Sequence, residues 1–184
     1  SDTCTIFRVP EESSHRSLPR LPSLSITLAC TLLFFLISFG IYGQTIGFQF
    51  VAWDDTTLVL TNPTVRGFSF ATLKAAFTTF DPELYVPLTM LSYQLNYALS
   101  GLNPAGYHFF NLLLHTFNAL FVAWLSALIL RTWKWGILCG ALFLLHPLHT
   151  EAIAWVSGRK DLLSTFFVLA TIISYMIASS SSTI

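Results

Sequence analysis

Apolar residues gather into four long segments of the chain, and polar residues collect between them. Residues 21–42 contain no charged residue, and 107–130 and 162–178 share this property. A helix needs roughly 20 residues to cross the hydrocarbon core of a bilayer. The pattern therefore predicts four transmembrane helices, at 21–42, 107–130, 133–150 and 162–178.

The segment 133–150 differs from the other three because polar residues interrupt its far end. His146, Pro147 and His149 lie there, and Glu151 follows directly. Proline breaks helices, and ionisable groups are costly in lipid. We expect the hydrocarbon-embedded part of this segment to stop close to Leu145.

The long segment 43–106 contains two shorter amphipathic patterns. Large apolar residues recur at helical spacing, at Phe70, Leu73, Phe77 and Phe80 and again at Leu88, Leu91, Leu95 and Leu99. Each pattern predicts a short interfacial helix whose apolar face is directed towards lipid or the bundle, the first with Ser69 as its cap. Asn62-Pro63 and Asp81-Pro82 are expected to form turns. The predicted fold is all-α: a polytopic membrane helix bundle with a long outer loop.

Composition supports an integral membrane protein, since 54% of the residues are hydrophobic and the chain holds 17 Phe and 5 Trp. The net charge is zero, which leaves no basic field for nucleic acid. Cys4, Cys30 and Cys139 form neither a disulfide framework nor a metal-binding spacing.

Basic residues near the segment ends predict the orientation. Residues 21–42 are too long an apolar run for a signal peptide, so they are interpreted as a retained anchor. Five basic residues flank the same side: Arg8, Arg16, Arg20, Arg131 and Lys134. The polar N-terminal segment 1–20 is therefore expected in the cytoplasm, and 43–106 and 151–161 at the outer or lumenal face. The Ser-rich end, 179–184, follows the last predicted helix.

Asp54 and Asp55 are adjacent carboxylates just outside the first apolar segment. Such a pair is often a solvated face or a helix cap. A functional alternative is equally open, because a carboxylate beside lipid can act as a general base and Trp53 provides an interfacial aromatic ring. In an extended loop the two side chains diverge, which disfavours a shared-proton dyad.

The second apolar segment carries a polar stripe, because four polar residues recur at helical spacing: His108, Asn111, His115 and Asn118. Such a face avoids lipid. Hydrogen bonds to neighbouring helices explain Asn111, His115 and Asn118 best. His108, at the outer end, is the better candidate for contact with a polar ligand.

His146, His149 and Glu151 are the residue types that bind zinc, but the proline between the histidines and their spacing argue against a metal site. They either satisfy a helix end or line a polar mouth opposite Asp54 and Asp55. Arg159 and Lys160 follow in a predicted tight turn, where they bind a lipid phosphate or anchor in headgroups.

Seven runs of residues carry a resemblance to a known family. They are Trp53-Asp54-Asp55 with Asn62-Pro63, Tyr85-Val86-Pro87-Leu88-Thr89, Leu91-Ser92-Tyr93, Gly101-Leu102-Asn103-Pro104-Ala105-Gly106-Tyr107-His108, Asn111-Leu112-Leu113-Leu114-His115, His146-Pro147-Leu148-His149-Thr150-Glu151 and Gly158-Arg159-Lys160-Asp161-Leu162-Leu163-Ser164. Over roughly residues 40–170 the chain resembles the N-terminal membrane part of the transmembrane and tetratricopeptide-repeat-containing O-mannosyltransferases and their prokaryotic relatives.

The resemblance implies a glycosyltransferase of the GT-C type, which takes a sugar, possibly mannose, from a polyprenyl-phosphate donor. The acceptor is a protein Ser/Thr hydroxyl or another group at the outer or lumenal face. By position, Asp54 or Asp55 matches the base, and Arg159 and Lys160 are candidates for the departing phosphate. His108, His146, His149 and Glu151 are further candidates for substrate or lipid-phosphate contact. No cofactor beyond the lipid-linked donor is implied, and a divalent metal is left open.

Two features depart from the family. Val86 stands where animal members carry arginine, which favours the prokaryotic relatives. Family members also continue through further spans into tetratricopeptide repeats, so the chain is expected to be a fragment or a truncated form of such an enzyme, and inactive alone. The expected location is a bacterial inner membrane or the endoplasmic reticulum membrane.

Two other classes compete with the enzyme. A non-catalytic anchor or assembly module would use the polar stripe for packing and the outer loop for docking. Half of a transporter is a further alternative, prompted by the intramembrane His and Asn residues.

Overall fold

The computed structural model describes residues 19, 22–80 and 84–181. The expected cytoplasmic segment at the N-terminus lies almost wholly outside these residues, as do the turn at Asp81-Pro82 and residues 182–184. The described part is mostly helical and contains no strand, which confirms the all-α prediction.

Three long helices are apolar enough to span a membrane, and a bent pair supplies a fourth span if it is counted as one. The long helices are α1 (Leu24–Tyr42), α4 (Pro104–Leu130) and α7 (Arg159–Ser181). The bent pair joins α5 (Trp133–Leu145) to the short stretch of η4 (Pro147–His149) and α6 (Thr150–Ala154), with an angle of 52° at the break. The break follows Leu145, where Pro147 was expected to end the helix.

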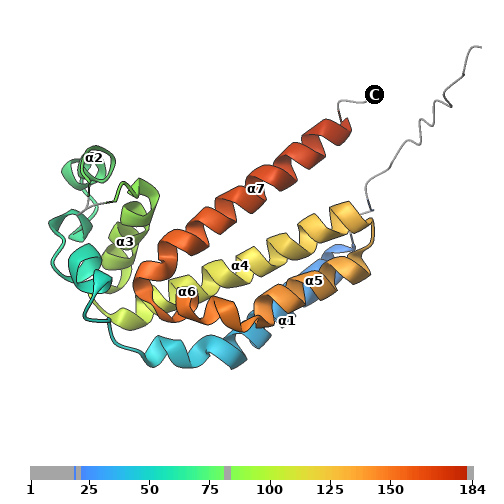
Figure 1. The fold of residues 1–184 in the computed structure, drawn as a ribbon, viewed down its shortest axis with the longest axis horizontal. Coiled ribbons are helices and arrows are strands. Elements are labelled where there is room, and N and C mark those ends of the chain that lie inside the picture. Colours follow the sequence, from blue (N-terminus) through green and yellow to red (C-terminus); the bar gives the residue numbers. More distant parts are fainter. Residues whose placement is uncertain (1–18, 20–21, 81–83, 182–184) are drawn as a thin grey trace, which may run out of the picture.

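Helix α4 is the centre of the bundle. Half of its most apolar window is buried, against 11% for the windows of α1 and α7. It packs along α5, contacts α1, and contacts the first part of α7, which separates from it towards the C-terminus (Figure 1). The outer sides of α1 and α7 expose large apolar residues such as Leu32 and Phe167, as lipid-facing helices do.

The interface between α4 and α5 is built from small residues. A methyl group added at Gly140 would lie 2.6 Å from the Cβ of Ala123 and 2.7 Å from the carbonyl oxygen of Ala119. One at Gly136 would lie 2.7 Å from the Cβ of Ala127. Gly136 and Gly140 are four residues apart and face alanines at the same spacing, an arrangement that lets helix backbones approach closely in a membrane.

The segment between α1 and α4 folds into several short helices, where a loop with interfacial helices was expected, and it is called the outer part because it lies beyond the end of the long-helix bundle (Figure 1). It contains η1 (Gly43–Gly47), the π-helical turn η2 (Thr56–Leu60), η3 (Pro63–Val65), α2 (Phe70–Thr78) and α3 (Pro87–Ser100). Ser69 caps α2, since its hydroxyl accepts a hydrogen bond from the Thr72 amide and the Thr72 hydroxyl accepts one from the Ser69 amide. Asn62 likewise caps η3.

This outer part packs at the end of the bundle where α4 begins (Figure 1). Its core joins Val59, Val65 and Met90 to Tyr107 at the start of α4 and to Val156 just before α7. The outer part is therefore fixed to two membrane helices by a shared apolar core. The short helix η5 (Val156–Gly158) lies within that contact.

Replacing Gly140 with alanine tests the close packing of α4 on α5. We expect Gly140→Ala to lower the free energy of unfolding by about 1–3 kcal/mol, because the added methyl group meets the backbone of α4. Gly40→Ala is the matched control, since nothing lies within 4 Å of a methyl group there. Thermal unfolding in detergent micelles measures both, and equal melting temperatures for the two variants would contradict this packing.

Candidate active site

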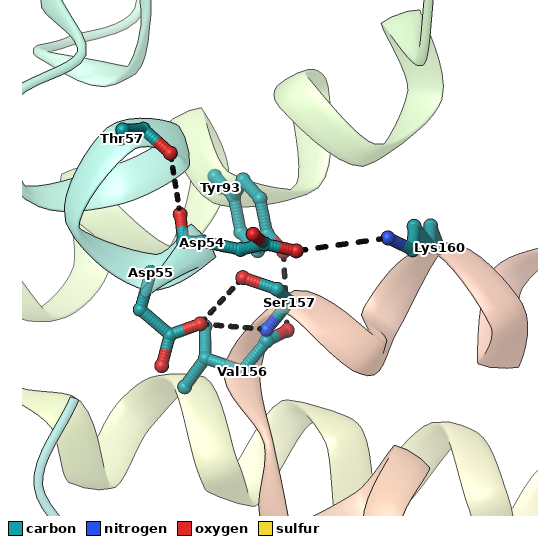
Figure 2. Close-up of polar contacts among 7 residues, drawn as sticks. All are labelled: Asp54, Asp55, Thr57, Tyr93, Val156, Ser157 and Lys160. Carbon is teal, nitrogen blue, oxygen red and sulfur yellow. Dashed lines mark hydrogen bonds and ion pairs between the residues drawn. The ribbon is translucent and has the colours of Figure 1, made fainter. Parts of the chain in front are cut away.

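Asp54 and Asp55 lie in a helical turn directly before η2, and not in an extended loop. Their side chains still diverge, as Figure 2 shows. The Asp54 carboxylate is 34% exposed, and its Oδ2 atom lies 4.0 Å from Nζ of Lys160. Asp55 is completely buried. Of these two adjacent residues, Asp54 thus has its carboxylate at the surface and Asp55 has its carboxylate in the interior.

The buried Asp55 joins the outer part to the segment before α7. Its Oδ2 atom accepts a hydrogen bond of 3.0 Å from the Val51 amide. Its Oδ1 atom accepts one of 2.9 Å from the Ser157 amide and a second from the Ser157 hydroxyl (Figure 2). A carboxylate whose oxygens are occupied in this way holds two chain segments together and has little capacity left for a substrate.

Arg159 is also completely buried, and its guanidinium is enclosed by hydrogen-bond acceptors. The side chain donates hydrogen bonds to oxygen atoms on α3 and α4, at Ser92, Asn96, Tyr107 and Asn111. Its charge also lies against aromatic rings, with centroids 4.8 Å away for Tyr93, 5.6 Å for Tyr107 and 5.3 Å for Phe110. Arg159 therefore fastens the start of α7 to α3 and α4 and is shielded from a lipid headgroup.

Tyr93 completes the connection between Arg159 and the acidic pair. Its hydroxyl donates a hydrogen bond of 3.1 Å to the Val156 carbonyl (Figure 2). Burial raises the pKa of the Tyr93 phenol, so the group stays protonated and remains a donor. Val156, Ser157 and Arg159 are thus each held by a different partner, and this short segment positions Asp55.

The polar stripe of α4 is completely buried. Asn111 donates 2.8 Å to the Trp155 carbonyl and accepts 2.8 Å from Nε of Arg159. His115 donates 3.2 Å to the Leu144 carbonyl, and Asn118 donates 2.9 Å to the Leu162 carbonyl. These bonds confirm the packing interpretation for all three residues. The His108 ring lies edge-on to Phe48, beside the backbone of Gln49.

The structure separates the predicted His and Glu cluster into two places. The half-buried His149 ring lies 5.3 Å from the His115 ring and 4.2 Å from the Phe143 ring, with His146 beside it. No hydrogen bond or ion pair joins either histidine to the acidic pair in the described part of the chain. Glu151, on α6, lines a surface depression together with Trp53. Within the described residues, no group of three or more His, Cys, Asp or Glu side chains could hold a metal ion.

Sequence reasoning missed three residues of this site: Ser157, Tyr93 and Asn96. Ser157 lies two residues before Arg159, the first residue of the predicted basic pair, and this position was a usable signal. Tyr93 and Asn96 lie three residues apart on the buried face of α3. A spacing of three residues places both side chains on one polar face of α3. The prediction for α3 used only the leucines on its opposite face and did not consider this polar face.

These features define an integral membrane protein of bundled helices, with a folded outer part that presents one partly exposed acid beside one partly exposed lysine. The sequence is similar to protein O-mannosyl-transferase Tmtc1 of Drosophila melanogaster, with 36% identity over 178 residues, covering 88% of this chain and 20% of that protein. It is 41% identical to protein O-mannosyl-transferase TMTC2 of Homo sapiens over 93 residues, covering 50% of this chain and 11% of that protein. Protein O-mannosyl-transferase TMTC1 of Homo sapiens is 31% identical over 146 residues, which cover 73% of this chain and 16% of that protein.

The chain belongs to this family of protein O-mannosyl-transferases. It spans a tenth to a fifth of the length of these curated relatives. No family model matches the sequence, and no solved structure matches it. All three relatives are animal proteins, whereas Val86 had favoured the prokaryotic branch.

Replacing Arg159 tests whether its hydrogen bonds hold the start of α7 against α3 and α4. We expect Arg159→Met to lower the free energy of unfolding by at least about 3 kcal/mol, because several buried oxygen atoms lose their donors. Lys160→Met is the matched control on the adjacent residue, with an expected change within about 1 kcal/mol, because its ion pair is partly exposed. Chemical unfolding followed by circular dichroism compares the two. Similar stabilities for both variants would show that the Arg159 network contributes little.

Proposed function

We propose that this chain forms part of a membrane protein O-mannosyltransferase that transfers mannose from a polyprenyl-phosphate donor to a Ser or Thr hydroxyl of a protein. The observation that carries the proposal is the difference between the two acids: Asp54 is partly exposed beside Lys160, whereas Asp55 is buried and accepts a hydrogen bond from the Ser157 amide. The names of the relatives support the sugar and the protein acceptor.

In the proposed reaction Asp54 is the general base. It takes the proton of the acceptor hydroxyl as that oxygen attacks the anomeric carbon of the sugar. A bond forms between the acceptor oxygen and the anomeric carbon, and the bond from this carbon to the phosphate oxygen breaks. The electron pair leaves with the polyprenyl phosphate. The base and the group that stabilises the departing phosphate act on one bound donor, and Asp54 and Lys160 lie at the same surface of the protein, with Oδ2 and Nζ 4.0 Å apart.

Lys160 is the proposed partner of the departing phosphate, because an ammonium group stabilises the negative charge that develops there. Its partial exposure and its position at the start of α7 allow it to reach a headgroup. Arg159 takes no such role in the proposal, since its guanidinium is buried and already bonded. The remaining predicted contacts, at His108, His146 and His149, have no assigned step.

Replacing the two acids one at a time tests whether Asp54 acts in catalysis and Asp55 acts in stabilising the fold. We expect Asp54→Asn to reduce transfer by at least about 100-fold, since the base is removed, with no loss of stability. Asp55→Asn is expected to destabilise the fold by about 1–3 kcal/mol, because an amide supplies one acceptor oxygen where the carboxylate uses two. Transfer of labelled mannose from polyprenyl-phosphate mannose to a Ser/Thr protein is measured in membranes that contain the complete protein, beside unfolding of each variant.

Asp161→Asn serves as the control, because this exposed acid lies close by in sequence on α7 and outside the proposed site. If Asp54→Asn transfers mannose like the unchanged protein, the catalytic proposal fails. A non-catalytic anchor that assembles a partner would then be the better account of the chain.

We further propose that the N-terminus is cytoplasmic and that the outer part lies in the lumen of the endoplasmic reticulum or outside a bacterial inner membrane. The basic residues before α1 and in the turn after α4 support this orientation. A cysteine introduced at Ser69, in a variant without Cys4, Cys30 and Cys139, tests it. A membrane-impermeant maleimide should label this cysteine from the lumenal side only, and labelling from the cytoplasmic side would reverse the orientation.

A further inference from the structure

A pocket of about 350 Å³ lies among α1, α4 and α5 and shares no residue with the candidate active site. Trp133 and Ile137, in the first turns of α5, line it together with residues of α1 and α4. Figure 1 shows the turn between α4 and α5 at the end of the bundle away from the outer part. The pocket therefore lies within the membrane-spanning helices, towards the end opposite Asp54 and Lys160.

The pocket extends lengthwise along two helices. Its lining on α1 reaches from Ile26 to Phe34, and its lining on α4 reaches from Phe117 to Trp124. At a rise of 1.5 Å per residue, each stretch is roughly 10–12 Å long. Both helices are candidate membrane spans, so the long direction of the pocket crosses the bilayer, as the acyl chains of lipids do.

Contacts between α1 and α4 fix the deep end of the pocket. The Thr116 hydroxyl donates a hydrogen bond of 2.9 Å to the Ser38 hydroxyl. Phe34, which lines the pocket, belongs to a buried cluster with Ala119 and Ala123. An apolar cavity does not take up water, and in a bilayer the apolar molecules at hand are lipid chains. A lipid chain is therefore the natural occupant of this pocket.

The turn beside the pocket carries positive charge. Arg131 and Lys134 are both exposed, and Nζ of Lys134 lies 5.9 Å from the centroid of the Trp135 ring. Such side chains pack their stems on apolar surface and extend their charged ends into the headgroup region. Helices α1, α4 and α5 contain no acidic residue, so the side-chain charge at this end of the three helices is positive.

An anionic phospholipid matches both parts of this arrangement. We propose that the pocket binds one acyl chain of such a lipid and that the phosphate-bearing headgroup lies at Arg131 and Lys134. The volume is within the range of about 300–1,000 Å³ that is usual for ligand pockets. Basic sites between transmembrane helices select anionic headgroups. The site goes beyond the transferase proposal, because none of its residues has a step in that reaction.

A further transmembrane helix is a poorer occupant than an acyl chain. With its side chains a helix is about 10–12 Å wide. The pocket narrows between α1 and α4 towards Ser38 and Thr116, where the two helices are joined by a hydrogen bond. An unbranched hydrocarbon chain is thinner than a helix and follows such a space without parting the helices.

Photocrosslinking of the complete protein in nanodiscs of phosphatidylcholine tests the inference. The two probes are phosphatidylserine and phosphatidylcholine, each with a diazirine on one acyl chain, and mass spectrometry locates the labelled residues. We expect the pocket-lining residues of α1 and α4 to be labelled at least about fivefold more by the phosphatidylserine probe, since the basic turn attracts its headgroup. Label on the exposed face of α7 measures general contact with lipid.

Two variants separate the acyl chain from the headgroup. Thr31→Phe places a ring in the pocket and should reduce labelling by both probes at least about fivefold, whereas Leu32→Phe is the matched control on the adjacent exposed residue. Lys134→Gln should lower the preference for phosphatidylserine about fivefold and leave labelling by phosphatidylcholine unchanged. Lys74→Gln, on the exposed side of α2, is its control.

Three outcomes would overturn the proposal. Equal labelling of the pocket by both probes in the unchanged protein would remove the anionic lipid. Label on α7 without label in the pocket would show that another segment of the protein covers it. A full preference for phosphatidylserine in Lys134→Gln would remove the basic turn from the site. This last comparison alters no buried residue, so it decides the matter even if Thr31→Phe fails to fold.

Discussion

The burial of the Arg159 guanidinium is the constraint on which the outer part of the structure depends. Moving a charged group out of water costs several kcal/mol unless hydrogen bonds and nearby charges or rings replace its hydration. Here the replacement comes from two helices, through oxygen atoms on α3 and α4 and the rings of Tyr93, Tyr107 and Phe110. Since no single helix could solvate the cation, the outer part and the bundle have to assemble around it together.

The geometry of the acidic pair follows from that assembly. Once Arg159 is fixed, Ser157 lies two residues away and presents its amide and hydroxyl to Asp55. Asp55 is drawn into the interior, and the helical turn then directs its neighbour Asp54 outwards (Figure 2). Identical side chains thus take different tasks because of their surroundings, as pairs of carboxylates often do.

The sequence predicted a helix correctly wherever the residues on one face of that helix were all apolar or all polar. The uncharged segments predicted α1, α4 and α7, the leucine pattern predicted α3, and the buried stripe on α4 bonds to neighbouring helices as expected. It was a poor guide to Arg159. A Gly-Arg-Lys-Asp run is typical of a solvated turn, and only the tertiary contacts with α3 show that the first basic residue is enclosed.

Two other features, the helical turn that contains the acids and the close packing at two glycines, could not be predicted from local sequence patterns. The acids were placed in an extended loop, because nothing nearby in the sequence announces the π-helical turn at Thr56. The glycines at positions 136 and 140 were visible, but their meaning depends on which helix they face. Both cases need the partner segment, which lies far away along the chain.

The bend after Leu145 has a consequence for the lipid around the protein. Helix α5 has 13 residues and so rises only about 20 Å, whereas the hydrocarbon core of a bilayer is about 30 Å thick. This hydrophobic mismatch favours local thinning of the membrane on the α5 side. Headgroups and water then reach deeper beside η4 than elsewhere around the bundle. The thickness of the surrounding membrane thereby becomes one of the conditions on which the packing around α5 depends.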